Sequence, residues 1–464
     1  MSSVKEQGVF EPALAEATLE ERCAHLVERA TAQGADEAEV YGTWSESISV
    51  RFEKGDLKLT QVDESGSVGL RVFKDKKLGF SSTNQTGEDS LAAVARDALT
   101  LASFSIPDDA NVLPGARPVP AAATLVTPAA ASFSVEQTVE AAREMFARAT
   151  AVDPRVAIDT ADLSISRVVH GVVSSRGVRA SESDAMLSCS LFGMAVDGDD
   201  VGGFDYWGDF ARDPANWDAV RDAVVAKFTD AVLGNLDAQR AETYTGAVLF
   251  APQALVPVLI SPLLSASSAI AVQRGRSALA EKVGKEIASP SLSIVDDPTD
   301  RSLAGATSFD REGTPVSRFN VLEKGVLQSY LYNGYAAQVE GRESTGHARG
   351  GARSVPGLGA HSLIVSGGDG GDQDALLARL GRGLFVQRFS GSVDPASGDF
   401  SGVAKSARWV ENGKVVRSLR ETLIAGNAFE LLRSIDALST DTLSLGGSMR
   451  APWAIVDGLS VTAG

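Results

Sequence analysis

Two kinds of hydrophobic pattern alternate along the first half of the chain. In one kind, apolar residues recur every three or four positions, the spacing of one helix face; these segments are 18–34, 89–103, 134–149 and 213–231. In the other kind, apolar and polar residues alternate between glycine-containing turns, which predicts antiparallel meanders; these segments are 38–86 and 157–210. Helix, meander and helix therefore occur twice, in 18–103 and 134–234, with low sequence identity between the two copies.

Local signals predict where several elements begin and end. Thr18 and Glu21 form a capping box at the start of the first helix, and Gly34 would end that helix in a left-handed conformation. Ser134 and Gln137 form a second capping box before the third helix. The predicted hairpin turns of the first meander are Glu53–Asp56 and Lys74–Lys77.

Residues 106–133 separate the two helix–meander units. The stretch 106–132 contains five prolines and many small residues, which is typical of a linker or an extended surface segment. We therefore predict an N-terminal α/β-meander domain, a linker, a second α/β-meander domain and a β-rich C-terminal domain. Their boundaries are 1–105, 106–133, 134–240 and 241–464.

The chain from Thr243 onward is glycine-rich, with many short strands and few helices. Asn412-Gly413 predicts a tight hairpin, and Asp372 ends a glycine-rich segment expected to cap a helix over Gln373–Leu380. The last predicted helix is Asn427–Leu438, and the tail from Pro452 reads as a strand. The predicted fold class is α+β, with N-terminal β-meander and helix layers followed by the β-rich C-terminal domain.

Length and composition narrow the class of protein. A chain of 464 residues is too long for one ordinary core, and 44% apolar and 22% charged residues are typical of a soluble globular protein. The net charge of −17 disfavours binding to a nucleic-acid backbone. The first twenty residues lack a basic and apolar leader, and the longest apolar run, Ala254–Leu264, is too short to span a membrane. Two cysteines cannot form a disulfide framework, so we expect a cytoplasmic protein.

Few motifs for nucleotide or metal chemistry are present. The sequence has no phosphate-binding loop, no strand-placed Gly-x-Gly-x-x-Gly and no Cys-x-x-Cys. Its four histidines are His25, His170, His347 and His361, and none forms a His-x-x-x-His or His-Glu-x-x-His pair. A zinc site built on paired histidines is therefore strongly constrained.

The densest polar segment is Arg342–Gly351, a glycine-rich loop around His347. Such a loop can bind peptide carbonyls or carboxylates; alternatively, its glycines only shape a tight turn in which His347 satisfies hydrogen bonds. A Ser–His–Asp triad stays open, although no Gly-x-Ser-x-Gly elbow supports one. The candidate contacts to a substrate or partner are Ser344, Thr345, His347 and Arg349 of this loop, Arg274 of a basic turn, and Asp399 of a second polar loop.

Five segments of the C-terminal half resemble the TldD/PmbA family. They are VQRGRSALAEKVGKEIASPSLSIVDDP, FDREGTPVSRFNVLEKGVLQSYLYNGYAA, STGHARGG, SGDFSGVAKSARWVENGKVV and ETLIAGNAFELLRSI, in the family's order. The N-terminal half is similar in pattern and weaker in motif. The resemblance implies a cytoplasmic, heteromeric metallopeptidase that acts on unfolded or linear peptides, including modified-peptide precursors and antitoxins.

The resemblance also implies which half of the complex this chain is. TldD-type subunits carry His-Glu-x-x-x-His on the helix before the Val-x-Arg/Lys-Gly-x-Ser turn, and a cysteine near the C-terminus. Counting back from Val272 places those metal-site positions at Ile260, Ser261 and Ser265, to within one residue, and no cysteine follows Cys189. STGHARGG and SGDFSG are similar to the PmbA side. We therefore expect a PmbA (TldE)-type subunit without catalytic residues or metal, with zinc in a TldD-type partner.

Two alternatives remain at this point. The chain could be a stand-alone hydrolase with a different centre, for example around His347. It could also be a non-enzymatic, protein-binding modulator, because the family has been linked by name to DNA gyrase and to antitoxins. The acidic charge means that a protein contact, and not DNA, would have to carry the second role.

Overall fold

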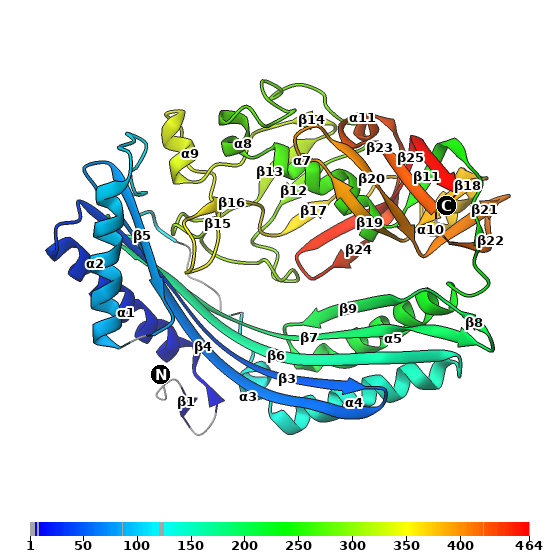
Figure 1. Cartoon of the computed structure of the whole chain (residues 1–464), viewed down its shortest axis with the longest axis horizontal. Helices are drawn as coiled ribbons and strands as arrows, with labels where there is room; N and C mark the ends of the chain where they lie inside the picture. The colour runs from blue at the N-terminus through cyan, green and yellow to red at the C-terminus, as the bar shows by residue number, and fades with distance from the viewer. Residues whose placement is uncertain (1–4, 7–8, 86, 120–124, 421, 464) are drawn as a thin grey trace.

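Long strands form a curved sheet in the N-terminal half (Figure 1). The computed structural model describes all residues except 1–4, 7–8, 86, 120–124, 421 and 464. The sheet has seven strands. Six follow the order β5-β4-β3-β6-β7-β8, and the seventh, β9, also pairs with β7. Their bounds are β3 Glu37–Glu53, β4 Asp56–Lys74, β5 Lys77–Thr83, β6 Val156–Ser174, β7 Arg179–Asp197, β8 Asp200–Val201 and β9 Asp205–Ala211. A short ribbon of β1 (Lys5–Glu6) and β2 (Val9–Phe10) precedes them.

Both predicted meanders contribute to this one sheet. β3 pairs antiparallel with β6 from Glu39↔Ser174 to Glu53↔Thr160, so strands from before and after the proline-rich segment are direct neighbours. The two predicted turns are confirmed, since Lys54 and Gly55, and likewise Asp75 and Lys76, adopt the positive φ angles of tight hairpins. The domain boundaries at 105 and 134 stay a prediction, but the units on either side share a sheet and a core.

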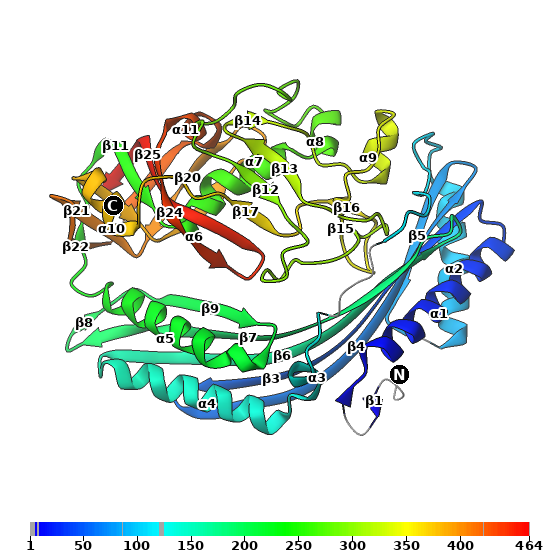
Figure 2. The same ribbon diagram turned by 180° about the vertical axis from the view of Figure 1, so that it is seen from behind.

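Helices cover the outer face of the sheet (Figure 2). They are α1 Pro12–Ala32, α2 Glu88–Phe104, α3 Pro128–Ser132, α4 Val135–Val152 and, after the 3-10 turn η1 (Pro214–Asn216), α5 Trp217–Leu233. Alternate residues of β6, such as Leu163 and Ile165, are buried with Leu26 and Phe228 beneath this helical layer. The intervening residues, such as Ser166 and His170, face the C-terminal half. The strand period of two therefore separates an apolar core from a polar inner face.

One helix start was predicted correctly and one was wrong. Ser134 and Gln137 form the predicted capping box, and Gly34 has the expected left-handed φ of 102°. The first helix, however, begins at Pro12, and the Thr18 hydroxyl donates to the Leu14 carbonyl within it at 2.7 Å. Proline at the first helical position is pre-organised for helix initiation, and this signal outweighed the capping box further along.

The C-terminal half contains a mixed sheet whose centre is its last strand. β25 pairs with β11, β17, β23 and β24. The main path of the sheet is β10-β22-β21-β18-β11-β25-β17-β12-β13-β14. The strands are β10 Gln239–Arg240, β11 Tyr244–Phe250, β12 Ile294–Asp296, β13 Phe319–Glu323, β14 Val326–Leu327, β17 Leu363–Val365, β18 Gly383–Val386, β19 Arg388–Val393, β20 Asp399–Lys405, β21 Ala407–Glu411, β22 Lys414–Arg420, β23 Thr422–Asn427, β24 Ile435–Leu445 and β25 Met449–Ala463. A separate pair consists of β15 Ala348–Arg349 and β16 Gly357–Leu358.

Short helices surround this second sheet. They are α6 Pro252–Leu255, α7 Ser261–Ala266, α8 Ala269–Gln273, α9 Gly334–Val339, α10 Gln373–Leu380 and α11 Ala428–Leu431, with a π-helical turn η2 at Val256–Ile260 and a 3-10 turn η3 at Leu432–Ser434. Asp372 caps α10 as predicted, accepting a hydrogen bond from Ala375 N. The predicted helix Asn427–Leu438 is too long, because residues from Ile435 onward leave it to pair with β25. Prolines 257 and 262 lack the N–H needed for regular α-helical bonding through η2 and α7.

The C-terminal half packs on the inner, concave face of the curved sheet (Figures 1 and 2). The contact includes the ion pair of Arg388 with Asp205 at 2.8 Å and the hydrogen bond from Tyr335 to Asp108 at 2.9 Å. The predicted α+β fold class is confirmed. Among the described residues, no helix is both long and apolar enough to cross a membrane.

Candidate functional site

A cavity with several polar and charged side chains in its wall lies where the concave sheet meets the C-terminal half. Its volume is about 450 Å³, and we call it the central cavity. Strands β6 and β7 supply Ser166, His170 and Glu182, while the C-terminal half supplies side chains that include Thr307, Arg311, Arg349 and His361. A second, more apolar cavity of about 610 Å³ adjoins it and shares Met186 and Ala304 in its wall. The site is therefore built jointly by the two halves of the chain.

Strand register places His170 and Glu182 together on the cavity wall. The two residues are direct partners across β6 and β7, and His170 Nε2 lies 3.0 Å from Glu182 Oε1. Glu182 also accepts hydrogen bonds from the Thr307 hydroxyl and from Ser308 N. Burial alone would raise the pKa of Glu182, but these hydrogen bonds and the charge of His170 bring it below the ordinary value. Glu182 thus joins the sheet to the 307–308 segment as a carboxylate.

The lowered pKa predicts a pH-dependent contribution of Glu182 to stability. The ionised side chain stabilises the folded state above its ordinary pKa of 4.5, and this contribution is lost as pH falls through the lower folded-state pKa. Glu182→Gln is therefore expected to reduce the free energy of unfolding most at neutral pH, with the difference from wild type narrowing on acidification. Urea unfolding of the wild type and of Glu182→Gln at a series of pH values measures this difference in the free energy of unfolding. Glu323→Gln, in the exposed β13–β14 turn, is the control; a gap for Glu182→Gln that does not change with pH would contradict the charge argument.

A buried ion cluster joins the sheet to the C-terminal half beside the cavity. It consists of Glu39, Arg71, Arg311 and Glu312, and we call it the interdomain ion cluster. Arg71 lies 2.7 Å from Glu39 and 2.9 Å from Glu312, and Arg311 lies 3.0 Å from Glu39. The Arg311 guanidinium also stacks 4.1 Å from the centre of the Tyr41 ring. Burial, together with the charge of Glu312, raises the pKa of the neighbouring Asp310 to about 7.

Asp296, His347 and His361 form a second buried cluster, which we call the His–His–Asp cluster. Asp296 ends β12, His347 precedes β15 and His361 precedes β17. Oδ2 of Asp296 lies 3.2 Å from His347 Nε2 and 3.2 Å from His361 Nδ1. Burial would raise the pKa of Asp296, but the two neighbouring histidines lower it strongly; burial lowers the pKa of His361. The backbone N–H groups of His361 and Ser362 also donate to this carboxylate.

The structure distributes the six predicted contact residues over three places. Ser344 and Thr345 donate to the Tyr332 carbonyl, and Thr345 Oγ1 lies 2.8 Å from His347 Nδ1, so this part of the loop folds inward. Arg349 of the same loop is exposed and lines the central cavity.

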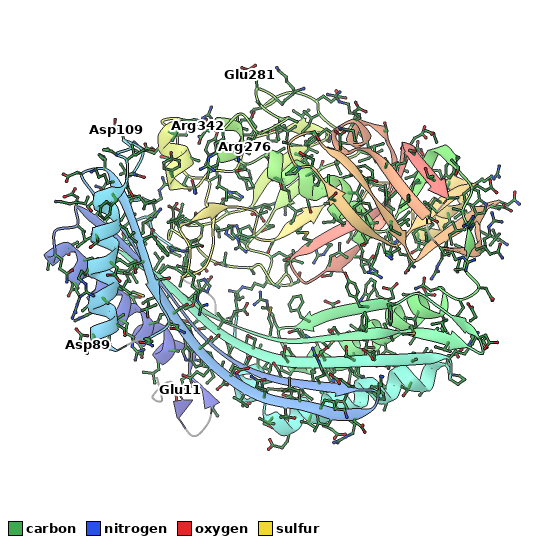
Figure 3. The ribbon with its side chains drawn as sticks, viewed as in Figure 1. Glu11, Asp89, Asp109, Arg276, Glu281 and Arg342 are labelled. Atoms are coloured by element: carbon green, nitrogen blue, oxygen red, sulfur yellow. The ribbon has the colours of Figure 1, made fainter. Side chains whose placement is uncertain are left out.

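The other two predicted residues lie apart from the cavity. Arg274 is exposed at the end of α8, in the same turn as Arg276, which Figure 3 shows on the outer side of the C-terminal half. Asp399 lies on β20, where it accepts a hydrogen bond from Asn427 at 2.8 Å. The roles of all six residues stay predictions.

The helix positions that correspond to the His-Glu-x-x-x-His motif of TldD-type subunits carry no metal ligands. Ile260 is fully buried at the end of η2. Ser261 begins α7, and the hydroxyl of exposed Ser265 donates back to the Ser261 carbonyl at 3.0 Å. Zinc needs imidazole, thiolate or carboxylate ligands, which isoleucine and serine do not supply. The residues present therefore do not fit a zinc ion on this helix.

Sequence reasoning did not single out several residues of the site. Asp296, His170, Glu182 and His361 carry no predicted role. The pairing of His170 with Glu182 follows from strand register once β6 and β7 are neighbours. Asp296 and His361 stand 65 positions apart in the sequence, and no local pattern links them.

The chain is similar to known proteins over almost all of its length. Residues 243–463 match the family model described as PmbA/TldA metallopeptidase C-terminal domain, and residues 38–102 match PmbA/TldA metallopeptidase domain 1, together more than half of the chain. A metalloprotease PmbA homolog of Haemophilus influenzae is 28% identical over 92% of this chain and 92% of its own. A TldD homolog from the same organism is 26% identical over 87% of this chain and 85% of its own.

Solved structures share the fold. TldE from Thermococcus kodakarensis superposes with a TM-score of 0.85 at 22% identity, covering 95% of this chain and all of the other. A Thermotoga maritima protein described as a proposed modulator of a DNA gyrase gives a TM-score of 0.83 at 24% identity, covering 96% of this chain and all of the other.

Proposed function

Since the chain belongs to the PmbA/TldD metallopeptidase family, on its PmbA (TldE) side, we propose that it is the non-catalytic subunit of a two-component cytoplasmic peptidase. Its partner is a TldD-type subunit that holds the zinc ion and cleaves unfolded or linear peptides. This chain serves assembly of the complex and enclosure of the substrate. The presence of both a PmbA and a TldD homolog in Haemophilus influenzae supports two cooperating chains.

The composition of α7 carries this proposal. Peptide hydrolysis at zinc needs ligands that fix the ion and a base that takes the proton of its bound water. At Ile260, Ser261 and Ser265 the helix provides neither an imidazole nor a carboxylate. Val256 and Pro257, just before these positions, line the adjoining cavity and are also apolar. This helix therefore supplies no reaction centre of that type, and we place the catalytic centre on the partner chain.

The concave site suits a role in enclosing a peptide. The central cavity presents hydroxyl, carboxylate and guanidinium groups, and the adjoining cavity presents apolar side chains such as Trp207 and Phe210. An extended peptide offers backbone polar groups and alternating side chains, which such a mixed lining can accept. The exposed guanidinium of Arg349 has no ion-pair partner among the described residues, so it is free to contact a carboxylate.

Proteolysis of an unfolded model protein by the purified chain, with and without a chelator, tests the proposal. We expect no cleavage by the chain alone, and chelator-sensitive cleavage after a TldD-type protein is added. The two chains should also co-purify. Chelator-sensitive cleavage by this chain alone, after contamination is excluded, would overturn the proposal, and so would failure of the two proteins to form a complex.

A stand-alone hydrolase is the second candidate, because Thr345, His347 and Asp296 are connected as in a hydrolase triad. However, Thr345 Oγ1 is engaged with both N and O of Tyr332, and Thr345 is not among the residues that line the two cavities. Full retention of any activity by His347→Ala would eliminate this candidate.

A third role, as a protein-binding modulator, would be favoured if a pull-down recovered gyrase and no TldD-type chain.

A further inference from the structure

The His–His–Asp cluster has the composition and spacing of a metal site. We propose that Asp296, His347 and His361 bind one divalent transition-metal ion, zinc in preference to magnesium or calcium. Two imidazoles and one carboxylate are a common ligand set for zinc, whereas magnesium and calcium prefer oxygen ligands only. This inference does not depend on the proposed function and concerns a part of the chain distant in sequence from α7.

Two of the three distances between the candidate ligand atoms fit a tetrahedral ion. One candidate ligand atom from each residue lies within 4.8 Å of the other two. Ligands bound to zinc at about 2.0–2.1 Å in a tetrahedron are about 3.3 Å from one another. His347 Nε2 and His361 Nδ1 each lie 3.2 Å from Asp296 Oδ2, which matches two edges of that tetrahedron. Three protein ligands leave a fourth position for water or another ligand.

Hydrogen bonding alone leaves this cluster incompletely satisfied. His347 is 2% exposed, and its Nε2, although 3.2 Å from the carboxylate, has no partner in hydrogen-bonding geometry among the described residues. An imidazole nitrogen buried without a partner costs free energy. A lone pair on Nε2 that is directed to an ion beside Asp296 removes this cost.

The surrounding groups orient the ligands as metal sites require. Thr345 Oγ1 contacts the other nitrogen of His347, Nδ1, at 2.8 Å, and such contacts fix ring orientation and tautomer. Asp296 is held by the N–H groups of His361 and Ser362, at 2.9 and 2.6 Å. The field of Arg349 opposes a cation here, but that side chain is exposed to solvent, which screens its charge.

A bound ion would connect the cluster to the central cavity. It would join the end of β12, the start of β15 and the segment before β17. His361 lines the cavity, and its Nε2 has no partner among the described residues, so metal binding through Nδ1 leaves an Nε2–H donor available to a ligand there. The metal would thereby fix the loop that presents Arg349 on the cavity wall.

Metal analysis of the untagged chain, purified without any partner, tests the inference. The protein is stripped with a chelator, reloaded with zinc and separated from free metal. We expect about one zinc ion per chain and tetrahedral absorption bands after loading with cobalt instead. Less than about a tenth of an equivalent of zinc in the folded wild-type chain would overturn the inference and identify the cluster as an internal hydrogen-bonded network.

Variants locate the ion. His347→Gln and His361→Gln should each lose the zinc and the cobalt bands, and Thr345→Val should weaken zinc binding about 10–100-fold in competition with a chromophoric chelator. His25→Gln, an exposed histidine on α1, is the matched control and should retain full binding. A loss of zinc binding in His25→Gln equal to that in the cluster variants would also overturn the inference. Complex formation with a TldD-type protein is scored separately, so failure of either proposal is visible by itself.

Discussion

Replacement of Arg71 by methionine is expected to lower the free energy of unfolding by about 3–5 kcal/mol. Arg71 is the shared cation of the interdomain ion cluster, bonded to Glu39 from the same sheet and to Glu312 from the C-terminal half. Both carboxylates are 1% exposed at their side chains, so removal of the guanidinium leaves Glu312 charged and buried without its ion-pair partner. Urea unfolding of the wild-type protein and of Arg71→Met at neutral pH measures the difference in the free energy of unfolding.

An exposed ion pair on the same sheet provides the control. Arg51 lies 2.6 Å from Asp162, but the two side chains are 45% and 34% exposed. Arg51→Met should therefore cost no more than about 1 kcal/mol. The double variant Arg71→Met/Glu312→Gln should recover part of the lost stability, because it removes the uncompensated charge. Equal effects of Arg71→Met and Arg51→Met would show that burial of the interdomain ion cluster is energetically irrelevant.

Gly305→Ala is expected to destabilise the protein by at least about 1–3 kcal/mol through steric overpacking. A Cβ atom at this position would lie 1.8 Å from the carbonyl oxygen of His361 and 2.9 Å from Ser362 Oγ. The His361 backbone cannot move away freely, since its N–H and that of Ser362 are both bonded to Asp296. The substitution should also reduce zinc retention, because it displaces a residue of the His–His–Asp cluster.

Gly351→Ala is the matched control for this substitution. A Cβ atom at Gly351 meets nothing within 4 Å, and its effect should stay within about 0.5 kcal/mol. Thermal unfolding and zinc content are measured for both variants. Unchanged stability of Gly305→Ala would mean that the 304–306 segment yields easily and that the close approach to His361 is not a constraint.

Local structure was predicted well where one chemical signal acts over a few residues. The hairpin at Asn412-Gly413, the capping box at Ser134 and the capped helix after Asp372 are all confirmed. The predictions failed where a distant partner decides the outcome. Residues after Ser434 have helical spacing but form β24, because the edge of β25 is available to them. Tertiary pairing commonly overrides intrinsic propensity in this way.

The site was less predictable than the fold for the same physical reason. Thr345, His347 and Arg349 share one loop, so the sequence alone grouped them, and the structure shows that two face inward and one lines the cavity. The partners of that loop come from β12, from the segment before β17 and from the concave sheet. Nothing in the local sequence around Glu182 or Asp296 encodes those neighbours. Only the packed arrangement of the two halves reveals them.

The central position of β25 governs the order in which this chain becomes structured during synthesis. β11 has β25 as a direct neighbour, yet about two hundred residues separate them in the sequence. At a translation speed of about 5–20 residues per second, β11 waits about 10–40 s for that neighbour. During this interval one edge of β11 stays open to other strands, which favours aggregation. The C-terminal sheet therefore closes last, whereas β3 and β4 are consecutive in the sequence and leave the ribosome close together.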